Sequence, residues 1–145
     1  MEYKNLLVLT DFSEDAEHAV RTSVEFAKRY EASITLLHVI HDSTNLSFIL
    51  SDDEYRSVDN KMEKHVERAF KALFEKVPEL NSVPCKTKIR RGTPYINCLY
   101  ELEKGDYDIV FAGSHGESRV KHVLMGSTSE KVLRNSPVDV FVTKR

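Results

Sequence analysis

Short apolar runs alternate along the chain with longer segments in which apolar residues recur every three or four positions. Short runs with few polar positions are typical of strands that are buried on both faces. The predicted strands of this kind are 5–9, 33–40, 109–112 and 138–142. The segments with helical spacing are 13–30, 55–77, 94–105 and 127–134. This alternation restricts the fold more than any other feature of the sequence.

A fifth strand is predicted at 83–89, where the apolar pattern has a period of two. Its polar side carries Lys86, Lys88 and Arg90, so we expect a half-exposed strand near a sheet edge with a solvated basic face. Strands that alternate with helices imply a parallel sheet, covered on both sides through right-handed crossovers. We therefore expect a single doubly wound α/β domain over residues 1–145.

The helix termini carry recognisable signals. Ser51 and Glu54 have the capping-box spacing before the second helix, and Pro78 marks the end of that helix. Thr93 followed by Pro94 supplies a cap and a first-position proline for the third helix. These signals support the predicted helix boundaries.

The charge balance argues against several kinds of partner. The 145 residues include 21 basic and 23 acidic ones, a net charge of −2, which favours neither nucleic acid nor an anionic membrane. No apolar run approaches the roughly 18–20 residues of a membrane span. Two cysteines, Cys85 and Cys98, are too few for a disulfide framework. We expect a cytoplasmic protein with no nucleic-acid or membrane partner.

Two strand exits carry the residues with most potential for binding. In an open parallel sheet, ligands bind beyond the carboxyl ends of the strands, where the strand order reverses. Asp11 follows the first strand, and Gly113 and Gly116 follow the fourth; both glycines can adopt positive φ and let backbone N–H groups approach a ligand. Gly126 precedes a helix whose first amides lack internal partners and attract phosphate. Three hydroxyls follow at 127–129.

The same residues also have simpler explanations. An aspartate before a helix, such as Asp11, is more often a cap than a ligand contact. Ser127 can cap the helix that follows Gly126. From these features alone, phosphate binding and a plain capped loop are about equally supported.

Catalytic and metal sites find little support in the sequence. Ser114 lies beside His115, but a nucleophile elbow needs glycines two positions on either side of the serine, and Gly113 is adjacent instead. No Gly-Lys-Ser/Thr follows at the spacing of a phosphate loop. His38 and His41 lack a carboxylate or cysteine partner and are a poor metal site. We assign no catalytic and no metal-ligating residue.

The chain resembles the universal stress protein family. Gly-x-x-Gly, nine further residues and then Gly-Ser form that family's nucleotide-binding signature, and residues 113–127 match it without a gap. The resemblance extends over essentially the whole chain. The other segments that are similar to the family are 7–13, 37–39 and 126–132.

The resemblance implies five parallel strands in the order 3-2-1-4-5, with the switch point between the first and the fourth. In ATP-binding members the first-strand aspartate, here Asp11, contacts the nucleoside, and the backbone at the end of the second strand, here Val39, meets the adenine edge. Glycines and hydroxyls of the signature hold ribose and phosphates: Gly113, Gly116, Gly126, Ser127, Thr128 and Ser129.

The resemblance also implies a homodimer in which the last strands, 138–142, pair antiparallel across a two-fold axis. An exposed edge strand of that length invites such pairing. The alternative is a monomer whose edge is protected by charged residues: Asp139, Lys144 and Arg145.

Two positions depart from the commonest family pattern. Leu9 stands where many ATP-binding members have proline, and Glu117 stands where many have arginine. A carboxylate near phosphates weakens their binding unless it turns to solvent or shares a cation. Arg119 lies two residues further on and can offset this charge, so we include it among the expected nucleotide-binding residues.

The leading interpretation is a stress-responsive regulatory module that binds ATP, with or without Mg²⁺, or a related adenine nucleotide. Any ATPase activity should be slow, because the sequence shows no placed general base or metal-binding carboxylate pair for in-line attack. The alternative is a nucleotide-independent, dimeric interaction protein of the same fold. Glu117 and the apolar cluster at 48–50, which can serve as a docking surface or a lid, motivate it.

Overall fold

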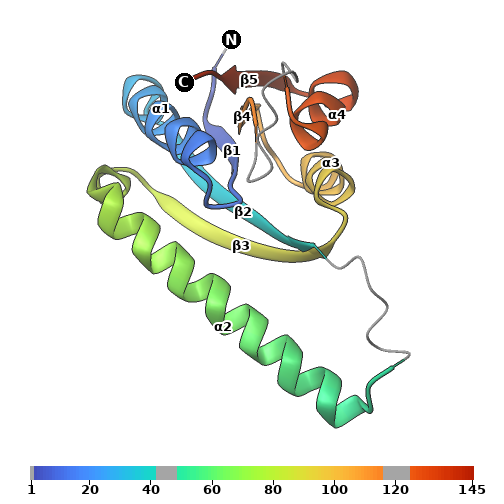
Figure 1. Ribbon diagram of the computed structural model, residues 1–145. Helices are drawn as coiled ribbons and strands as arrows, with labels where there is room; N and C mark the ends of the chain where they lie inside the picture. Colours follow the sequence, from blue (N-terminus) through green and yellow to red (C-terminus); the bar gives the residue numbers. More distant parts are fainter. Residues whose placement is uncertain (1, 42–48, 116–124) are drawn as a thin grey trace.

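A computed structural model describes residues 2–41, 49–115 and 125–145 and contains the predicted alternation of strands and helices (Figure 1). In chain order the elements are β1 (Asn5–Leu9), α1 (Glu14–Tyr30), β2 (Ser33–His41), α2 (Asp52–Lys76), the 3₁₀ helix η2 (Pro78–Ser82), β3 (Cys85–Gly92), α3 (Pro94–Lys104), β4 (Ile109–Gly113), α4 (Ser127–Asn135) and β5 (Asp139–Thr143). The helix signals explain these boundaries: Ser13 accepts a bond from the Ala16 N–H, and Ser51 accepts one from the Glu54 N–H.

The five strands are all parallel and lie in the order β3-β2-β1-β4-β5, which confirms the predicted topology. β1 is central, with Leu7 opposite Thr35 of β2 on one side and Val110 of β4 on the other. From β1 the chain continues outward to β2 and β3, whereas β4 and β5 lie on the opposite side. The strand order therefore reverses between β1 and β4.

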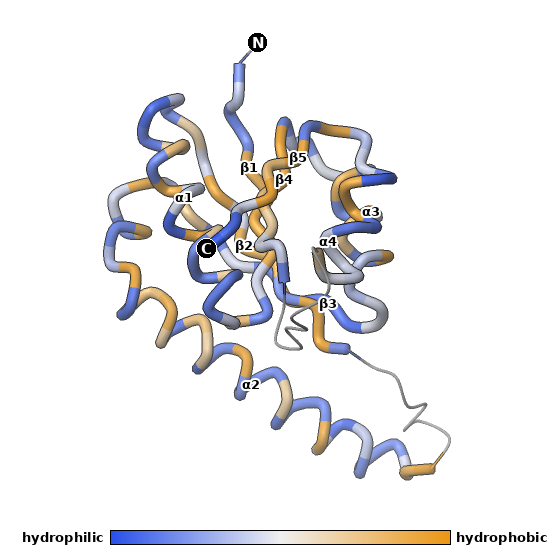
Figure 2. The backbone as a smooth tube through the Cα atoms, turned by 45° about the horizontal axis from the view of Figure 1, so that its top comes forward, coloured by the Kyte–Doolittle hydropathy of each residue, from blue (hydrophilic) through white to orange (hydrophobic). Residues whose placement is uncertain are grey.

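Helices cover both faces of the sheet, as a doubly wound fold requires (Figure 1). On one face, side chains of β1, β2 and β4 pack with α1, α2 and η2, and the buried residues of these helices include Val20, Val66 and Leu80. On the other face, Leu7 and Val110 pack with α3 and α4. Figure 2 shows the resulting pattern, with apolar strands at the centre. The loops after β1 and β4 thus lead to opposite faces.

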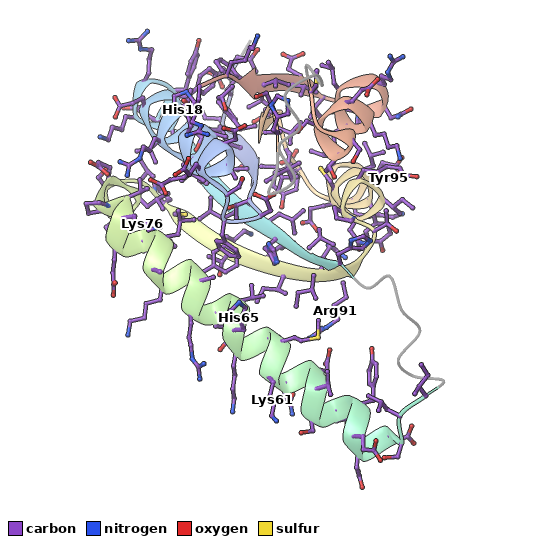
Figure 3. All side chains as sticks on the ribbon, in the orientation of Figure 1. His18, Lys61, His65, Lys76, Arg91 and Tyr95 are labelled. Carbon is purple, nitrogen blue, oxygen red and sulfur yellow. The ribbon has the colours of Figure 1, made fainter. Side chains whose placement is uncertain are left out.

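The edge strand β3 differs from its prediction in its bounds, Cys85–Gly92 instead of 83–89, and in the role of its basic residues. It lies at the sheet edge, as expected, but Lys88 and Arg90 are not simply solvated: both bind Glu101 of α3, at 2.6 Å from Lys88 Nζ and 2.7 Å from Arg90 Nε. Arg91 pairs with Asp59 of α2 at 2.6 Å, and Figure 3 shows it between β3 and α2. The basic residues therefore connect the edge strand to both helical layers.

The longest helix, α2, runs across one face and extends beyond the sheet at its N-terminal end (Figure 1). Its fully buried residues, Val66, Phe70 and Leu73, all lie in the C-terminal half. The helix ends before Pro78, as predicted, but that proline also begins η2, which the sequence patterns did not indicate. Within the parts of the chain described above, no helix combines the length and the apolar character that a membrane crossing requires.

Candidate functional site

A cleft of about 320 Å³ opens at the switch point, beyond the carboxyl ends of β1, β2 and β4 and beside the start of α4. This volume lies within the usual range of small-molecule sites. The walls combine apolar and polar groups, including the exits of both central strands. The residues that line the cleft include Leu9, Thr10, Asp11, Leu37, His38, Val39, His41, Pro94, Ala112, Gly113, His115, Gly126, Ser127, Thr128 and Ser129.

Seven of the nine residues that the sequence suggested for nucleotide binding line this one cleft: Asp11, Val39, Gly113, Gly126, Ser127, Thr128 and Ser129. They come from four places that are far apart in the sequence. The parallel sheet brings them together, because the carboxyl ends of its strands share one edge. Gly116 and Arg119, together with Glu117, lie outside the described residues.

The start of α4 supports anion binding and excludes one alternative. Gly126 occupies the N-cap position and Ser127 is the first helical residue, so the interpretation of Ser127 as the cap is wrong. Because glycine has no side chain, no N-cap side chain covers the amides of the first turn, which carry the positive end of the helix dipole. Ser127 is exposed and Thr128 half-buried where they line the cleft.

Ser129 has a different role from the two hydroxyls that precede it. It is buried, and its hydroxyl donates a 2.6 Å hydrogen bond to the Gly113 carbonyl. A hydroxyl has only one proton to donate. While this bond is kept, Ser129 therefore fixes α4 against the end of β4 and can offer a phosphate only its backbone N–H.

The exit of β1 is held by local hydrogen bonds. The Thr10 N–H donates to the Leu37 carbonyl at 2.9 Å, and Asp11 accepts a bond from the Ser13 N–H at 3.0 Å. Ser13, not Asp11, is the N-cap of α1, so the interpretation of Asp11 as that cap is wrong. Phe12 has a φ of +65°, a strained backbone for a bulky residue, and its ring packs on His38. The turn thus places Asp11 at the cleft.

Gly113 is required for packing and not for an unusual backbone conformation. It is the last residue of β4, and the expected positive φ is not found there. A Cβ atom at this position would lie 2.7 Å from the Asp15 carbonyl oxygen in the first turn of α1. The missing side chain therefore lets the first turn of α1 approach the end of β4.

Ser114 is a structural residue at the end of β4. It is 3% exposed and is not among the residues that line the cleft. Its N–H donates to the Thr143 carbonyl at 3.0 Å, and its carbonyl accepts from the Gly126 N–H. Ser114 thus connects β4 to β5 and to the start of α4, which leaves it no access as a nucleophile.

The sequence reasoning missed three histidines in the lining of the cleft. His38 and His41 had been considered only as metal ligands, and His115 only as a partner of Ser114. The Nδ1–H of His38 donates to the Thr10 carbonyl at 2.8 Å. The position of these three histidines at strand exits was the signal in the sequence that could have revealed them. Among the described residues, no three histidine, cysteine, aspartate or glutamate side chains are grouped for metal binding.

Comparisons with known proteins agree with this geometry. The sequence model of the Universal stress protein family matches residues 2–144. A protein of Staphylococcus saprophyticus named as a universal stress protein is 28% identical over 145 residues, which are 99% of this chain and 85% of the relative. Among solved structures, the hypothetical protein MJ0577 is similar with a TM-score of 0.86 and 29% identity, over 100% of this chain and 98% of the other.

Other solved structures share the fold at lower identity. Universal stress protein UspA from Lactobacillus plantarum has a TM-score of 0.81 and 25% identity, with 98% of each chain covered. A universal stress protein in complex with cAMP has a TM-score of 0.72, and an Arabidopsis thaliana member with AMP bound has one of 0.60; each is 16% identical to this chain, over at least 98% of it and 92% or more of the other. From the family match over residues 2–144 and these likenesses, we conclude that the chain belongs to the universal stress protein family.

Proposed function

We propose that this protein binds ATP or a related adenine nucleotide in the switch-point cleft and acts as a stress-responsive regulatory module of the cytoplasm. The observation that carries the proposal is the convergence of Asp11 with the first turn of α4 in one cleft. Gly126 leaves that turn without an N-cap side chain. A carboxylate suited to ribose hydroxyls and a set of amides suited to phosphate thus face the same space.

The composition of the walls supports a nucleotide more than a simple anion. Leu37, Val39 and Pro94 offer apolar surface on the side of β2 and α3. The side of α4 offers the hydroxyl residues 127–129. A ligand with a flat apolar base and a charged phosphate group would match both ends of the cleft.

Nucleotides bound to other members of the family give further support. Two proteins with this fold carry cAMP and AMP, both of which are adenine nucleotides. At 16% identity they share the fold with this chain, so their ligands suggest a class of ligand and not a particular nucleotide. We expect hydrolysis of ATP to be slow at most, since the sequence shows no placed general base or metal-binding carboxylate pair for in-line attack.

Isothermal titration with ATP and Mg²⁺ tests the proposal. We expect saturable binding to the wild-type protein and its loss in a Gly126→Val variant, whose branched side chain would stand over the first turn of α4. Leu133→Ser is the matched control, because Leu133 is exposed on the same helix and does not line the cleft. Absence of binding heat at millimolar ATP in the wild-type protein would refute nucleotide binding.

A second candidate function is that of a nucleotide-independent interaction protein. The exposure of Ile49 favours this second function. Ile49 belongs to the expected apolar cluster at 48–50, lies just before α2 and is 78% exposed. Phe48 of the same cluster lies outside the described residues. Mass spectrometry of ligand released from the purified, unfolded protein separates the two. A co-purified adenine nucleotide supports the first function. Unchanged partner binding and stress phenotype in the Gly126→Val variant would support the second.

A further inference from the structure

We propose that His115 couples nucleotide binding to proton uptake, so that the affinity of the cleft depends on pH. This inference rests on the proposed nucleotide-binding function and adds a regulation to the same site. His115 lines the cleft, follows β4 after Ser114, and lies beside Asp15 of the first turn of α1. Its imidazole takes up a proton when an anionic ligand binds.

The first argument comes from the basic groups of the cleft. Within the described residues that line it, the groups that can carry positive charge are three histidines, and there is no lysine or arginine. Asp11 adds negative charge at the β1 exit. Among these described residues, backbone amides and imidazole groups are therefore the ones that can balance the charge of a phosphate. Histidine is the side chain that ordinarily changes its charge near neutral pH.

The second argument comes from the surroundings of His115. Its Nδ1 lies 3.6 Å from the Asp15 carboxylate and 3.1 Å from the Ser114 hydroxyl. Asp15 is only 4% exposed and binds the guanidinium of Arg145 at 2.5 Å; the same guanidinium binds Glu14 at 2.6 Å. His115 therefore lies beside a buried carboxylate that is shared with the cation of Arg145.

The other titratable groups around the cleft are less suited to this role. His38 donates from Nδ1 to the Thr10 carbonyl and packs on Phe12, so its ring is held by the turn that follows β1. His41 is exposed at the end of β2, where water screens its charge. On α4, the residues that line the cleft are uncharged hydroxyl residues. His115 is thus the histidine of the cleft that has a buried carboxylate beside it.

Calorimetry with ATP and Mg²⁺ in two phosphate-free buffers of different ionisation enthalpy tests the proposal. At pH 7 the wild-type protein should take up more protons per bound nucleotide than a His115→Gln variant, and the difference cancels the titration of the nucleotide itself. Between pH 6 and 8 the wild-type affinity should fall by up to about tenfold more than that of the variant. His115→Lys, which keeps a positive charge, should bind with the shallower pH dependence of His115→Gln but more tightly at pH 8.

His65→Gln is the control, since His65 is exposed on α2 and does not line the cleft (Figure 3). It should keep the wild-type proton uptake. If His115→Gln and His115→Lys both retain that uptake, or if His38→Gln or His41→Gln loses it instead, the inference is wrong while nucleotide binding stands. If the wild-type protein binds no ATP at any pH, the proposed function and the inference both fail.

Discussion

Gly113 lies where the first turn of α1 crosses the end of β4. Since an added Cβ would meet backbone atoms of Asp15, including its carbonyl oxygen at 2.7 Å, no side-chain rotation can relieve the contact. We expect Gly113→Ala to lower the free energy of unfolding by about 1–3 kcal/mol, the usual cost of overpacking, and urea denaturation measures it.

Gly126→Ala is the comparison for this substitution. Gly126 has φ −67° and ψ 158°, a conformation that any residue adopts, so a methyl group there should cost less, about 1 kcal/mol or below. Equal losses in both variants would contradict the close-packing role of Gly113.

Glu101 is a buried carboxylate with three donors. It is 2% exposed and accepts bonds from Lys88 at 2.6 Å, Arg90 at 2.7 Å and the Tyr107 hydroxyl at 2.8 Å. Burial by itself would raise the pKa of Glu101, but the bonds from Lys88, Tyr107 and Arg90 outweigh it, so this pKa lies below its ordinary value. Burial, together with the bond to Glu101, raises the pKa of Tyr107 to about 12.

We expect Glu101→Gln to lower the free energy of unfolding at pH 7 by about 2–4 kcal/mol, because two cations lose their buried partner. A carboxylate whose folded pKa is lowered stabilises the protein above its unfolded pKa, about 4.3, and loses this effect as pH falls through the folded value. The difference between wild type and variant should therefore shrink between pH 5 and pH 2. Urea titrations at several pH values measure it, with exposed Glu103→Gln as control. A pH-independent difference would refute the argument.

At the scale of elements, α2 is anchored unevenly. Its buried residues lie in the C-terminal half, whereas the N-terminal half is tied to β3 by Arg91, which pairs with Asp59 at 2.6 Å and Glu63 at 3.5 Å (Figure 3). Few buried apolar contacts imply a low free energy of local opening. We therefore expect faster amide exchange over residues 52–64 than over 66–76.

Arg91→Met keeps an apolar stem and removes the charge. It should speed exchange over 52–64 by about twofold to fivefold, since partly exposed ion pairs contribute little, and should leave 66–76 unchanged. Lys86→Met is the matched control on the same strand, because Lys86 is exposed. Exchange measured by mass spectrometry decides the matter, and faster exchange along the whole of α2 would show that the ion pairs do not act locally.

The strand and helix types could be predicted because periodicity is a local property. Within the described residues, five strands, four helices and the cap at Ser51 follow from patterns within a few residues. Two errors are local and concern the helix caps, which are Ser13 and Gly126 and not Asp11 and Ser127. The other errors concern contacts between segments that are apart in the sequence. Gly113 is explained by Asp15, and the basic face of β3 by Glu101; neither partner is near in sequence. The histidines of the cleft lie at the ends of predicted strands, so their position could be inferred from the sequence, whereas their contacts could not.

At the scale of the whole molecule, the site follows from topology. The exits of β1 and β4 are neighbours, yet their loops lead to α1 and α4 on opposite faces. A space therefore opens between them, and it receives the N-terminal end of α4. Doubly wound sheets bind ligands at this place for the same reason. The salt bridge between Asp15 and Arg145 also connects the first turn of α1, beside the cleft, to the residues that follow β5.

β5 is the last strand in the sheet order, so its outer side is an open edge of the sheet that the structure describes. The Ser114 N–H binds the Thr143 carbonyl, so the peptide groups of Thr143 face β4. Peptide groups alternate sides along a strand, which means that those of Val140 and Val142 face the open edge. Phe141 stacks on Phe111 with ring centroids 5.0 Å apart and is still 39% exposed. This edge offers both backbone groups and apolar surface to a second copy.

We therefore expect a homodimer through paired β5 strands, and Val142→Pro tests it. Proline removes an N–H that faces the open edge and leaves the bonds between β4 and β5 in place, so the strand should fold but no longer pair with a partner. Light scattering after size exclusion should give a dimer for the wild-type protein and a monomer for Val142→Pro. Val142→Ala loses the same side-chain packing but keeps the N–H, and should stay dimeric. A dimeric Val142→Pro variant would place the interface elsewhere, and a monomeric wild-type protein would favour an edge protected by its charged neighbours.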